Sequence, residues 1–398
     1  MRANPAQRPP AGSPWGHVPY PWRAAIGLGS PYPSRFYASL ITQSLRFGLP
    51  ARRRMGPLLA FAGRRSPPRA PLALGLRAVA RRQQRSDLDQ LLDALVERWP
   101  ELTAGHATLP SEPPPLTALV LQRRAALTLF AFGQRSAPLM VLKVPAPGDT
   151  RVEHEVNALR VAGPAGLGPR PLGQVAEGWV QEALEGDPLR VEPLSPAGAR
   201  RLGWPPLMEE LAHALTRLGE ASRRRASPDE LQRPLERALA DGAIGSTTRR
   251  LLAAARRDLR QLDVAVLRHR DTSPQNCLFS GGRFVGLVDW EDAAPLGAPG
   301  YDTLNAALSY LDLGVGLQRW SEALVLECFT SAWAGEFGHR ARAAARASAS
   351  AAGVPERLLA PLEFAFFGWR VGRRLDNPSF YPTTAGIAAR MLESVARE

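Results

Sequence analysis

The chain has 398 residues, 45% of them apolar and 22% charged, which is enough apolar material for a sizeable core and two packed lobes. Its apolar runs fall short of the ~20 residues that a membrane-spanning helix needs, and the first 30 residues lack the compact apolar stretch of a signal peptide. Two cysteines in unrelated contexts, Cys277 and Cys328, are expected to be reduced thiols, so the expected location is cytoplasmic.

The net charge of +13 is concentrated at one end of the chain. Residues 1–86 contain 15 arginines and no acidic residue, so the rest of the chain is close to neutral. Such a segment can attract an anionic membrane surface or nucleic acid. Because it contains no recognisable nucleic-acid module, we expect weak membrane-surface contact and no specific nucleic acid. A further interpretation is that part of it precedes the true start, with Met55 as the alternative.

The first 115 residues are predicted to form two regions. Residues 1–85 are rich in Pro, Gly and Arg and are interpreted as weakly structured, with a short helix as an alternative over Phe36–Leu49. Ser86 and Asp89 resemble a capping box ahead of a helical apolar pattern. Residues 86–115 are therefore predicted to form a helix and a proline-rich linker, and folded structure is expected to begin there.

Residues 116–187 predict a small lobe that is rich in strands. Alternating apolar residues and helical spacing indicate strands at Leu116–Leu121, Leu127–Phe132 and Leu139–Val144, a helix at Arg151–Val161 and a further strand at Trp179–Leu184.

Residues 188–398 predict a larger, mostly helical lobe. The expected elements are helices at Leu207–Leu218, Asp229–Leu239 and Thr247–Leu262, a hairpin of Asn276–Phe279 with Phe284–Val288, and helices from Asp302 onward. The fold class is therefore α+β, with a small β-rich lobe followed by a larger helical one.

One residue type is almost missing from the chain. Its 50 basic residues comprise 49 arginines and a single lysine, Lys143. A position that keeps lysine is a candidate for a task that the guanidinium cannot perform, such as fitting a compact charge between phosphate oxygens. Retention by chance is the alternative.

The most informative stretch runs from His269 to Asn276 and reads His-Arg-Asp-Thr-Ser-Pro-Gln-Asn, and the hairpin after it ends in Val-Asp-Trp-Glu at 288–291. Phosphoryl transfer needs a carboxylate that takes the proton of the attacking hydroxyl, oxygen ligands for Mg²⁺ and a cation on the phosphates. Asp271 fits the first task. Asn276 and Asp289 fit the second, because the hairpin brings them together.

These residues resemble the aminoglycoside phosphotransferase and choline kinase family, which has the protein-kinase-like fold. The resemblance runs from about Leu116 to about Leu392. The family loop usually reads His-Gly-Asp, with Asn five residues after the Asp, and its later Ile-Asp-Trp-Glu signature corresponds to residues 288–291 here. Arg270 replaces the family's glycine, and the loop Gln122–Ala125 contains no glycine to cover phosphates.

The resemblance implies further roles. Lys143 matches the lysine that grips the phosphates, and Glu155 matches the helix glutamate that pairs with it. The backbone of the hinge is expected to bind adenine, with Gln181, Glu182 and Leu184 as its contact residues. Asp302, after a Gly-x-Pro turn, and His269 are expected to support the catalytic loop.

The resemblance thus implies a kinase that moves the γ-phosphate of ATP or GTP, with Mg²⁺, to a hydroxyl of a small molecule. The C-terminal region from Phe337 contains nine arginines against five acidic residues, which disfavours a polycationic aminoglycoside and favours a sugar or an anionic metabolite as acceptor. A solvated helix face is the alternative explanation of these arginines. A pseudokinase with a regulatory or scaffolding role is the alternative function.

Overall fold

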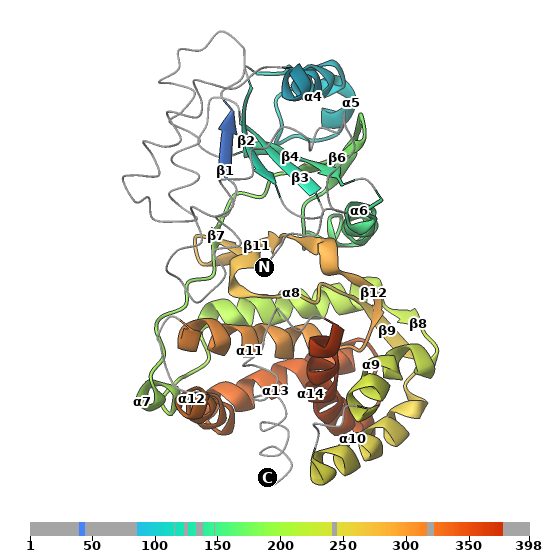
Figure 1. Cartoon of the computed structure of the whole chain (residues 1–398), viewed down its shortest axis with the longest axis vertical. Coiled ribbons are helices and arrows are strands. Elements are labelled where there is room, and N and C mark those ends of the chain that lie inside the picture. Colours follow the sequence, from blue (N-terminus) through green and yellow to red (C-terminus); the bar gives the residue numbers. More distant parts are fainter. Residues whose placement is uncertain are drawn as a thin grey trace, which may run out of the picture. The chain divides into compact units, whose positions relative to one another are not determined.

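The computed structural model describes residues 40–43, 86–114, 116–122, 126–132, 138–146, 148–240, 245–316 and 322–376. The chain divides into two compact units, residues 1–156 with 170–185 and residues 157–169 with 186–398 (Figure 1). The first carries an antiparallel sheet and the second is mostly helical, which confirms the predicted fold class. The predicted boundary after residue 187 stays a prediction, and residues 157–169 group with the second unit.

A six-stranded antiparallel sheet forms the centre of the first unit, in the order β1-β2-β3-β4-β6-β5. Its strands are β1 (Leu40–Gln43), β2 (Thr117–Gln122), β3 (Ala126–Phe132), β4 (Pro138–Pro145), β5 (Pro171–Val175) and β6 (Gly178–Glu182). The four strands predicted from alternation correspond to β2, β3, β4 and β6, with small shifts at their ends.

Two strands of this sheet differ from the expectation. Strand β1 lies inside the stretch for which a helix was the alternative, and it pairs with β2 along its whole length. The helix interpretation is therefore wrong at these four residues, and the other residues before 86 lie outside the described part of the chain. Strand β5 was not predicted, because proline and glycine interrupt its alternation and only pairing with β6 defines it.

Two helices, α4 (Ser86–Glu97) and α5 (Trp99–Thr103), pack their apolar side chains against one face of the sheet. Leu129 on β3 and Met140 and Leu142 on β4 contribute to this core. Successive side chains of a strand point to opposite faces, so Lys143, next to Leu142, belongs to the other face. The strand period thus keeps the lysine out of this apolar core.

Helix α6 (Arg151–Ala162) follows β4. Its first turn is capped by Asp149, whose Oδ1 accepts a hydrogen bond from the Arg151 amide at 2.9 Å. A second hydrogen bond, from the Arg151 side chain, holds the pKa of Asp149 below its usual value. Val152, Val156 and Leu159 are buried, as the predicted apolar face requires. Glu155 lies one turn before Leu159 on the same helix.

The second unit is built from helices around one apolar core. Its helices are α7 (Pro196–Ala199), α8 (Pro206–Ser222), α9 (Pro228–Ala240), α10 (Ser246–Asp258), α11 (Tyr301–Gly316), α12 (Glu322–Ala334), α13 (Glu336–Ala351) and α14 (Leu359–Asp376). Helix α13 packs against α8, α11 and α12, and α14 packs against α9 and α10 (Figure 1).

Two small sheets of this unit carry the loop predicted to be catalytic. One has the order β11-β10-β7 and the other β12-β9-β8. Their strands are β7 (Asp187–Pro188), β8 (Arg224–Arg225), β9 (Val264–Arg268), β10 (Cys277–Ser280), β11 (Arg283–Leu287) and β12 (Ala294–Gly297). The hairpin β10–β11 was predicted, whereas β9 and β12 were not.

The prediction of a helix to Leu262 extends too far. Helix α10 ends at Asp258 and a short 3₁₀ turn, Leu259–Gln261, follows it. The next residues form β9, which is buried along its length. A short apolar run reads equally well as a helix end or a buried strand, and only pairing with β8 and β12 settles it. Within the described residues, no helix is both long and apolar enough to span a bilayer.

Candidate active site

The His-Arg-Asp loop follows directly from β9. It leads through a single 3₁₀ turn, Pro274–Asn276, into β10. Arg270 has φ 67°, in the left-handed region that glycine adopts without strain. A non-glycine residue there costs on the order of 1–3 kcal/mol, and such positions concentrate at functional sites. The conformation also explains why glycine suits this position in the family pattern.

Asp302 holds the backbone of this loop from the first turn of α11. Its Oδ2 accepts the amide of His269 at 2.6 Å, and its Oδ1 accepts the amide of Arg270 at 3.2 Å. Its own backbone carbonyl accepts the hydroxyl of Thr272 at 2.9 Å. These bonds join residues about 30 positions apart and connect the start of α11 to the loop. The supporting role of Asp302 stays a prediction.

His269 connects the loop to the end of the hairpin. Its ring is fully buried, with Nε2 3.0 Å from the carbonyl oxygen of Val288 and Nδ1 3.3 Å from the amide of Asp271. Because that amide donates, Nδ1 must accept, and the ring proton belongs on Nε2. The centroids of the His269 and Trp290 rings lie 4.5 Å apart in an edge-on arrangement. The supporting role of His269 stays a prediction.

Asp271 is held at its backbone on both sides. Its amide donates to His269, and its carbonyl accepts Nδ2 of Asn276 at 3.0 Å. The residue is partly exposed, unlike buried His269. A carboxylate on a fixed backbone that a substrate can reach is the arrangement that proton abstraction requires.

The hairpin brings Asn276 and Asp289 to one end, as predicted. Cys277 pairs with Leu287, and the amide of Val288 donates to the carbonyl of Asn276 at 3.0 Å. Asp289 comes next, with φ 70° in the left-handed region. Oδ1 of Asp289 is a buried oxygen. The side chain of Asn276 uses its nitrogen for the Asp271 carbonyl, while its buried Oδ1 accepts no hydrogen bond from the described residues.

This oxygen pair fits Mg²⁺. A buried amide oxygen without a donor is costly unless a ligand satisfies it, and Mg²⁺ prefers oxygen ligands. In the part of the chain that the structure describes, no group of three His, Cys, Asp or Glu residues could hold a metal. A magnesium ion here would therefore take one carboxylate and one amide oxygen from the protein, with its other ligands from phosphate and water.

Lys143 and Glu155 form an ion pair inside the first unit. The lysine Nζ lies 2.6 Å from both carboxylate oxygens of Glu155. The two residues are 9% and 1% exposed. The pair joins β4 to α6, so the partner expected from the resemblance is the one that the structure provides.

The predicted hinge lies at the end of β6. Gln181 is buried and pairs with Val141 of β4. The amides of Glu182 and Ala183 donate to the carbonyls of Arg170 and Leu139, at 2.9 and 3.3 Å. Those two donors are used within the sheet, so an adenine ring would have to use the donor of Leu184 or the carbonyls of the hinge.

Sequence reasoning missed several polar residues around the loop. Asn305 on α11 donates through Nδ2 to the Thr272 hydroxyl at 3.1 Å and to the Arg270 carbonyl at 3.3 Å. Its Oδ1 accepts Nη1 of Arg370 at 2.8 Å. Arg268, the last residue of β9, binds Asp302. The available signal for Arg268 was a lone charge that closes an apolar strand, which ordinarily indicates a solvent-exposed strand end.

The thiol of Cys277 is a structural donor. It donates to the carbonyl of Ser273 at 3.3 Å, and burial raises its pKa. Nucleophilic chemistry needs the thiolate, so this buried thiol is unsuited to it. Cys328 is also buried, and both cysteines are free thiols, as expected.

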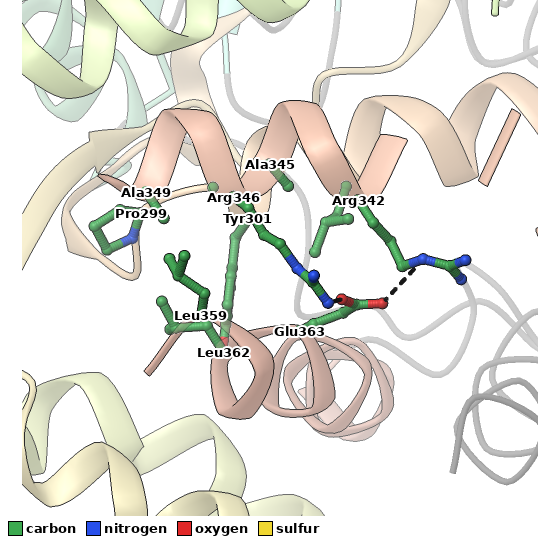
Figure 2. Close-up of a pocket in the computed structure, with 11 residues that line it drawn as sticks. Pro299, Tyr301, Arg342, Ala345, Arg346, Ala349, Leu359, Leu362 and Glu363 are labelled. Atoms are coloured by element: carbon green, nitrogen blue, oxygen red, sulfur yellow. Dashed lines mark hydrogen bonds and ion pairs between the residues drawn. The ribbon is translucent and has the colours of Figure 1, made fainter. Parts of the chain in front are cut away.

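A cleft on the second unit lies near the start of α11 but has the wrong chemistry for a phosphate. It is lined by apolar and charged residues of α13 and α14, together with Tyr301 and its neighbours at the start of α11. Figure 2 shows Arg342 and Arg346 both directed at Glu363, and Arg346 Nη2 lies 3.0 Å from its carboxylate. Both guanidinium groups are already paired with this carboxylate and are not available to a phosphate, so we assign no catalytic role to this cleft.

Comparison with known proteins gives one family. The model of the family described as "Phosphotransferase enzyme family" matches residues 130–346, which is more than half of the chain. The match covers Lys143, Glu155, the His-Arg-Asp loop and the hairpin. No curated protein sequence matches the chain.

Several solved structures are similar in shape. A choline/ethanolamine kinase family protein from Mesorhizobium loti is 17% identical, with 76% of this chain and 94% of that chain covered and a TM-score of 0.39. A macrolide 2′-phosphotransferase from Brachybacterium faecium is 20% identical, covering 67% and 99%, with a TM-score of 0.37. A thermostable mutant of aminoglycoside phosphotransferase APH(4)-Ia, in a ternary complex with ADP and hygromycin B, is 14% identical, covering 70% and 93%, with a TM-score of 0.44.

Proposed function

This chain belongs to the phosphotransferase enzyme family, and from that premise we propose that it transfers the γ-phosphate of ATP or GTP to a hydroxyl group of a small molecule. The observation that carries the proposal is the loop geometry. Asp302 anchors a left-handed turn ahead of Asp271, and the same loop binds Asn276, whose side-chain oxygen is left for a cation. A loop built for scaffolding alone would have no need of a strained turn and an unsatisfied buried oxygen.

The reaction assigns one task to each group. Asp271 orients the acceptor hydroxyl and takes its proton as the oxygen attacks the γ-phosphorus. The bond from that phosphorus to the β–γ bridging oxygen breaks, and the nucleoside diphosphate leaves with the electron pair. Asp271 then returns the proton to solvent. Catalysis of this kind depends mainly on positioning and on charge stabilisation.

The phosphates are assigned to two sets of residues. Lys143, held by Glu155, would supply a compact positive charge to the phosphate oxygens. Asn276 and Asp289 would hold Mg²⁺, which neutralises charge that develops on the phosphate oxygens. Gln181, Glu182 and Leu184 would form the hinge that takes the base. The hinge contacts do not distinguish ATP from GTP.

The acceptor is assigned only as a small-molecule hydroxyl. The C-terminal arginines suggested an anionic acceptor, but five of them have partners within the second unit. Arg340 binds Glu209, Arg342 and Arg346 bind Glu363, Arg357 binds Gln261, and Arg370 binds Asn305. These contacts favour a structural role for the arginines, so the charge of the acceptor is left open. The glycine-free loop Gln122–Ala125 argues for the pseudokinase alternative, whereas the presence of every chemical group that the reaction needs argues against it.

A turnover screen tests the proposal. The full chain is incubated with ATP or GTP, Mg²⁺ and pooled hydroxyl metabolites, and phosphorylated products are read by mass. Asp271→Asn is the paired variant, and it should retain nucleotide binding while losing at least about 10²-fold in turnover, the scale of general-base effects. Equal turnover of both proteins on an identified acceptor would remove Asp271 from the reaction.

Nucleotide binding without any product in either protein would instead support the pseudokinase alternative. Asn157→Ala, an exposed substitution on α6, serves as a control for nonspecific loss of activity.

A further inference from the structure

Arg268 is a buried cation directly behind the catalytic loop. It ends β9 and is 3% exposed. Its Nε and Nη2 both lie within hydrogen-bond distance of Oδ1 of Asp302, at 3.1 and 2.9 Å. A buried charge is retained at such a position only when it is paired, and here the partner is the carboxylate that holds the loop.

The guanidinium of Arg268 is fixed by aromatic rings as well as by charge. Its Cζ lies 4.2 Å from the ring centroid of Trp369 on α14 and 5.0 Å from that of Tyr301. Gly297 on the neighbouring strand β12 leaves space for it, since a Cβ there would come within 2.3 Å of the Arg268 Cδ. A flat cation held between rings and a carboxylate has little freedom to move.

Asp302 consequently accepts four donors with one carboxylate. Two come from Arg268 and two are the amides of His269 and Arg270. Arg268 and the Arg270 amide both donate to Oδ1 of Asp302. The position of the guanidinium therefore determines where that oxygen can accept the hydrogen bond from the strained turn. Arg270 in turn sets the direction in which Asp271 leaves the turn.

We propose that Arg268 is a positioning residue for phosphoryl transfer: it fixes Asp302 and, through Asp302, the left-handed turn that aims Asp271. The proposal rests on the proposed function. The far end of this connection is Trp369. The next residue of α14, Arg370, reaches the same loop independently through Asn305. Helix α14 thus contacts the supports of the loop by two routes.

The main test compares Arg268→Met with Arg256→Met in the full chain. Both remove a paired arginine of the second unit, and Arg256 on α10 pairs with Glu236 on α9 instead of with a residue that binds the loop. Arg268→Met should lower kcat by about tenfold or more while the KM for nucleotide stays within about twofold, because positioning acts on the transition state. Arg256→Met should leave both unchanged.

A double variant tests whether Arg268 acts through Asp302. If it does, Asp302→Asn should cost much less in the Arg268→Met background than in the parent. Arg268→Lys, which keeps the charge but loses the planar fork, should recover part of the lost kcat. Full additivity of the two single effects would contradict the proposal.

Hydrogen exchange of the loop amides separates this inference from the proposed function. The amides of His269 and Arg270 are protected by Asp302, and they should exchange faster in Arg268→Met at a temperature where the protein stays folded. This result is expected whether or not an acceptor is found. Unchanged exchange with unchanged kcat per folded molecule would overturn the inference, whatever the melting temperature does.

Should Arg268→Met fail to fold, Trp369→Leu carries the same test, because it keeps both charges and removes only the ring beneath the guanidinium. A lower kcat with faster loop exchange would support the proposal, and parent-like values of both would contradict it.

Discussion

The ion pair of Lys143 and Glu155 is the clearest single-residue feature of the first unit. Both carboxylate oxygens lie 2.6 Å from Nζ, and both residues are buried. Removing one partner of such a pair costs about 3–5 kcal/mol, because the other charge is left buried without compensation. This pair is costly to break, and it contains the single lysine of the chain. It is therefore a candidate for a functional role and not an incidental surface ion pair.

Lys143→Arg should therefore impair the enzyme severely although the charge is kept. The guanidinium is wider, planar and differently forked, so it cannot occupy the same space beside Glu155 and still present a compact charge to phosphate. We expect a loss of at least about 10²-fold in turnover, on the scale of positioning effects, and weaker nucleotide binding. Turnover and nucleotide affinity are measured together with the melting temperature.

Arg160→Lys is the matched control, because Arg160 is exposed on the same helix as Glu155. It should match the parent in all three measurements. A Lys143→Arg protein that also matched the parent would show that lysine was retained here by chance.

At the scale of elements, the hairpin β10–β11 is the feature that the local sequence encodes best. Its turn, Ser280-Gly281-Gly282, has two glycines with positive φ, at 57° and 80°. This turn pairs Ser280 with Arg283, and after a one-residue register shift between Leu278 and Phe279 the strands pair Cys277 with Leu287. Asn276 consequently lies beside Val288, the residue before Asp289. A metal site built on a hairpin depends on pairing that is local in sequence, so it is predictable without the rest of the fold.

Asn276→Ala and Asp289→Ala should each raise the Mg²⁺ concentration needed for half-maximal turnover, by about tenfold or more if each supplies a ligand oxygen. Gln275→Ala, an exposed neighbour, should leave the requirement unchanged. Magnesium titrations of turnover at saturating nucleotide provide the measurement. Parent-like titrations for both variants would exclude the two residues as ligands.

At the scale of the whole molecule, charge is divided very unevenly. Fifteen arginines precede the first acidic residue, Asp87, and the remaining chain is near neutral. Eleven of these arginines lie in residues 44–85, after β1. Replacing them would change the charge of the segment while leaving the sequence of the edge strand intact.

We expect the full chain to co-sediment with anionic vesicles at low salt and to be released at high salt, because screened charges attract weakly. A variant with those 11 arginines changed to glutamine should lose most of this binding and keep its turnover. Neutral vesicles are the control. Binding that is independent of salt, or equal in both proteins, would rule out electrostatic attachment.

The sequence by itself determined the parts of this protein that depend on neighbouring residues. Alternation along β4 predicted Lys143 on a strand, helical spacing predicted α6 with Glu155, and the hairpin after Asn276 predicted its approach to Asp289. These features follow from periods of two and 3.6 residues and from turn chemistry, which act over a few positions.

Only the tertiary structure decided how the His-Arg-Asp loop is supported. Arg268 meets an aspartate 34 positions away and a tryptophan on α14, and Asn305 meets the loop from α11. In the sequence, Arg268 is merely a charge at the end of an apolar run. It can be buried because Asp302 supplies the opposite charge, Trp369 a flat surface and Gly297 an open space. Those three residues come together only when distant segments pack, so no local pattern could have indicated them.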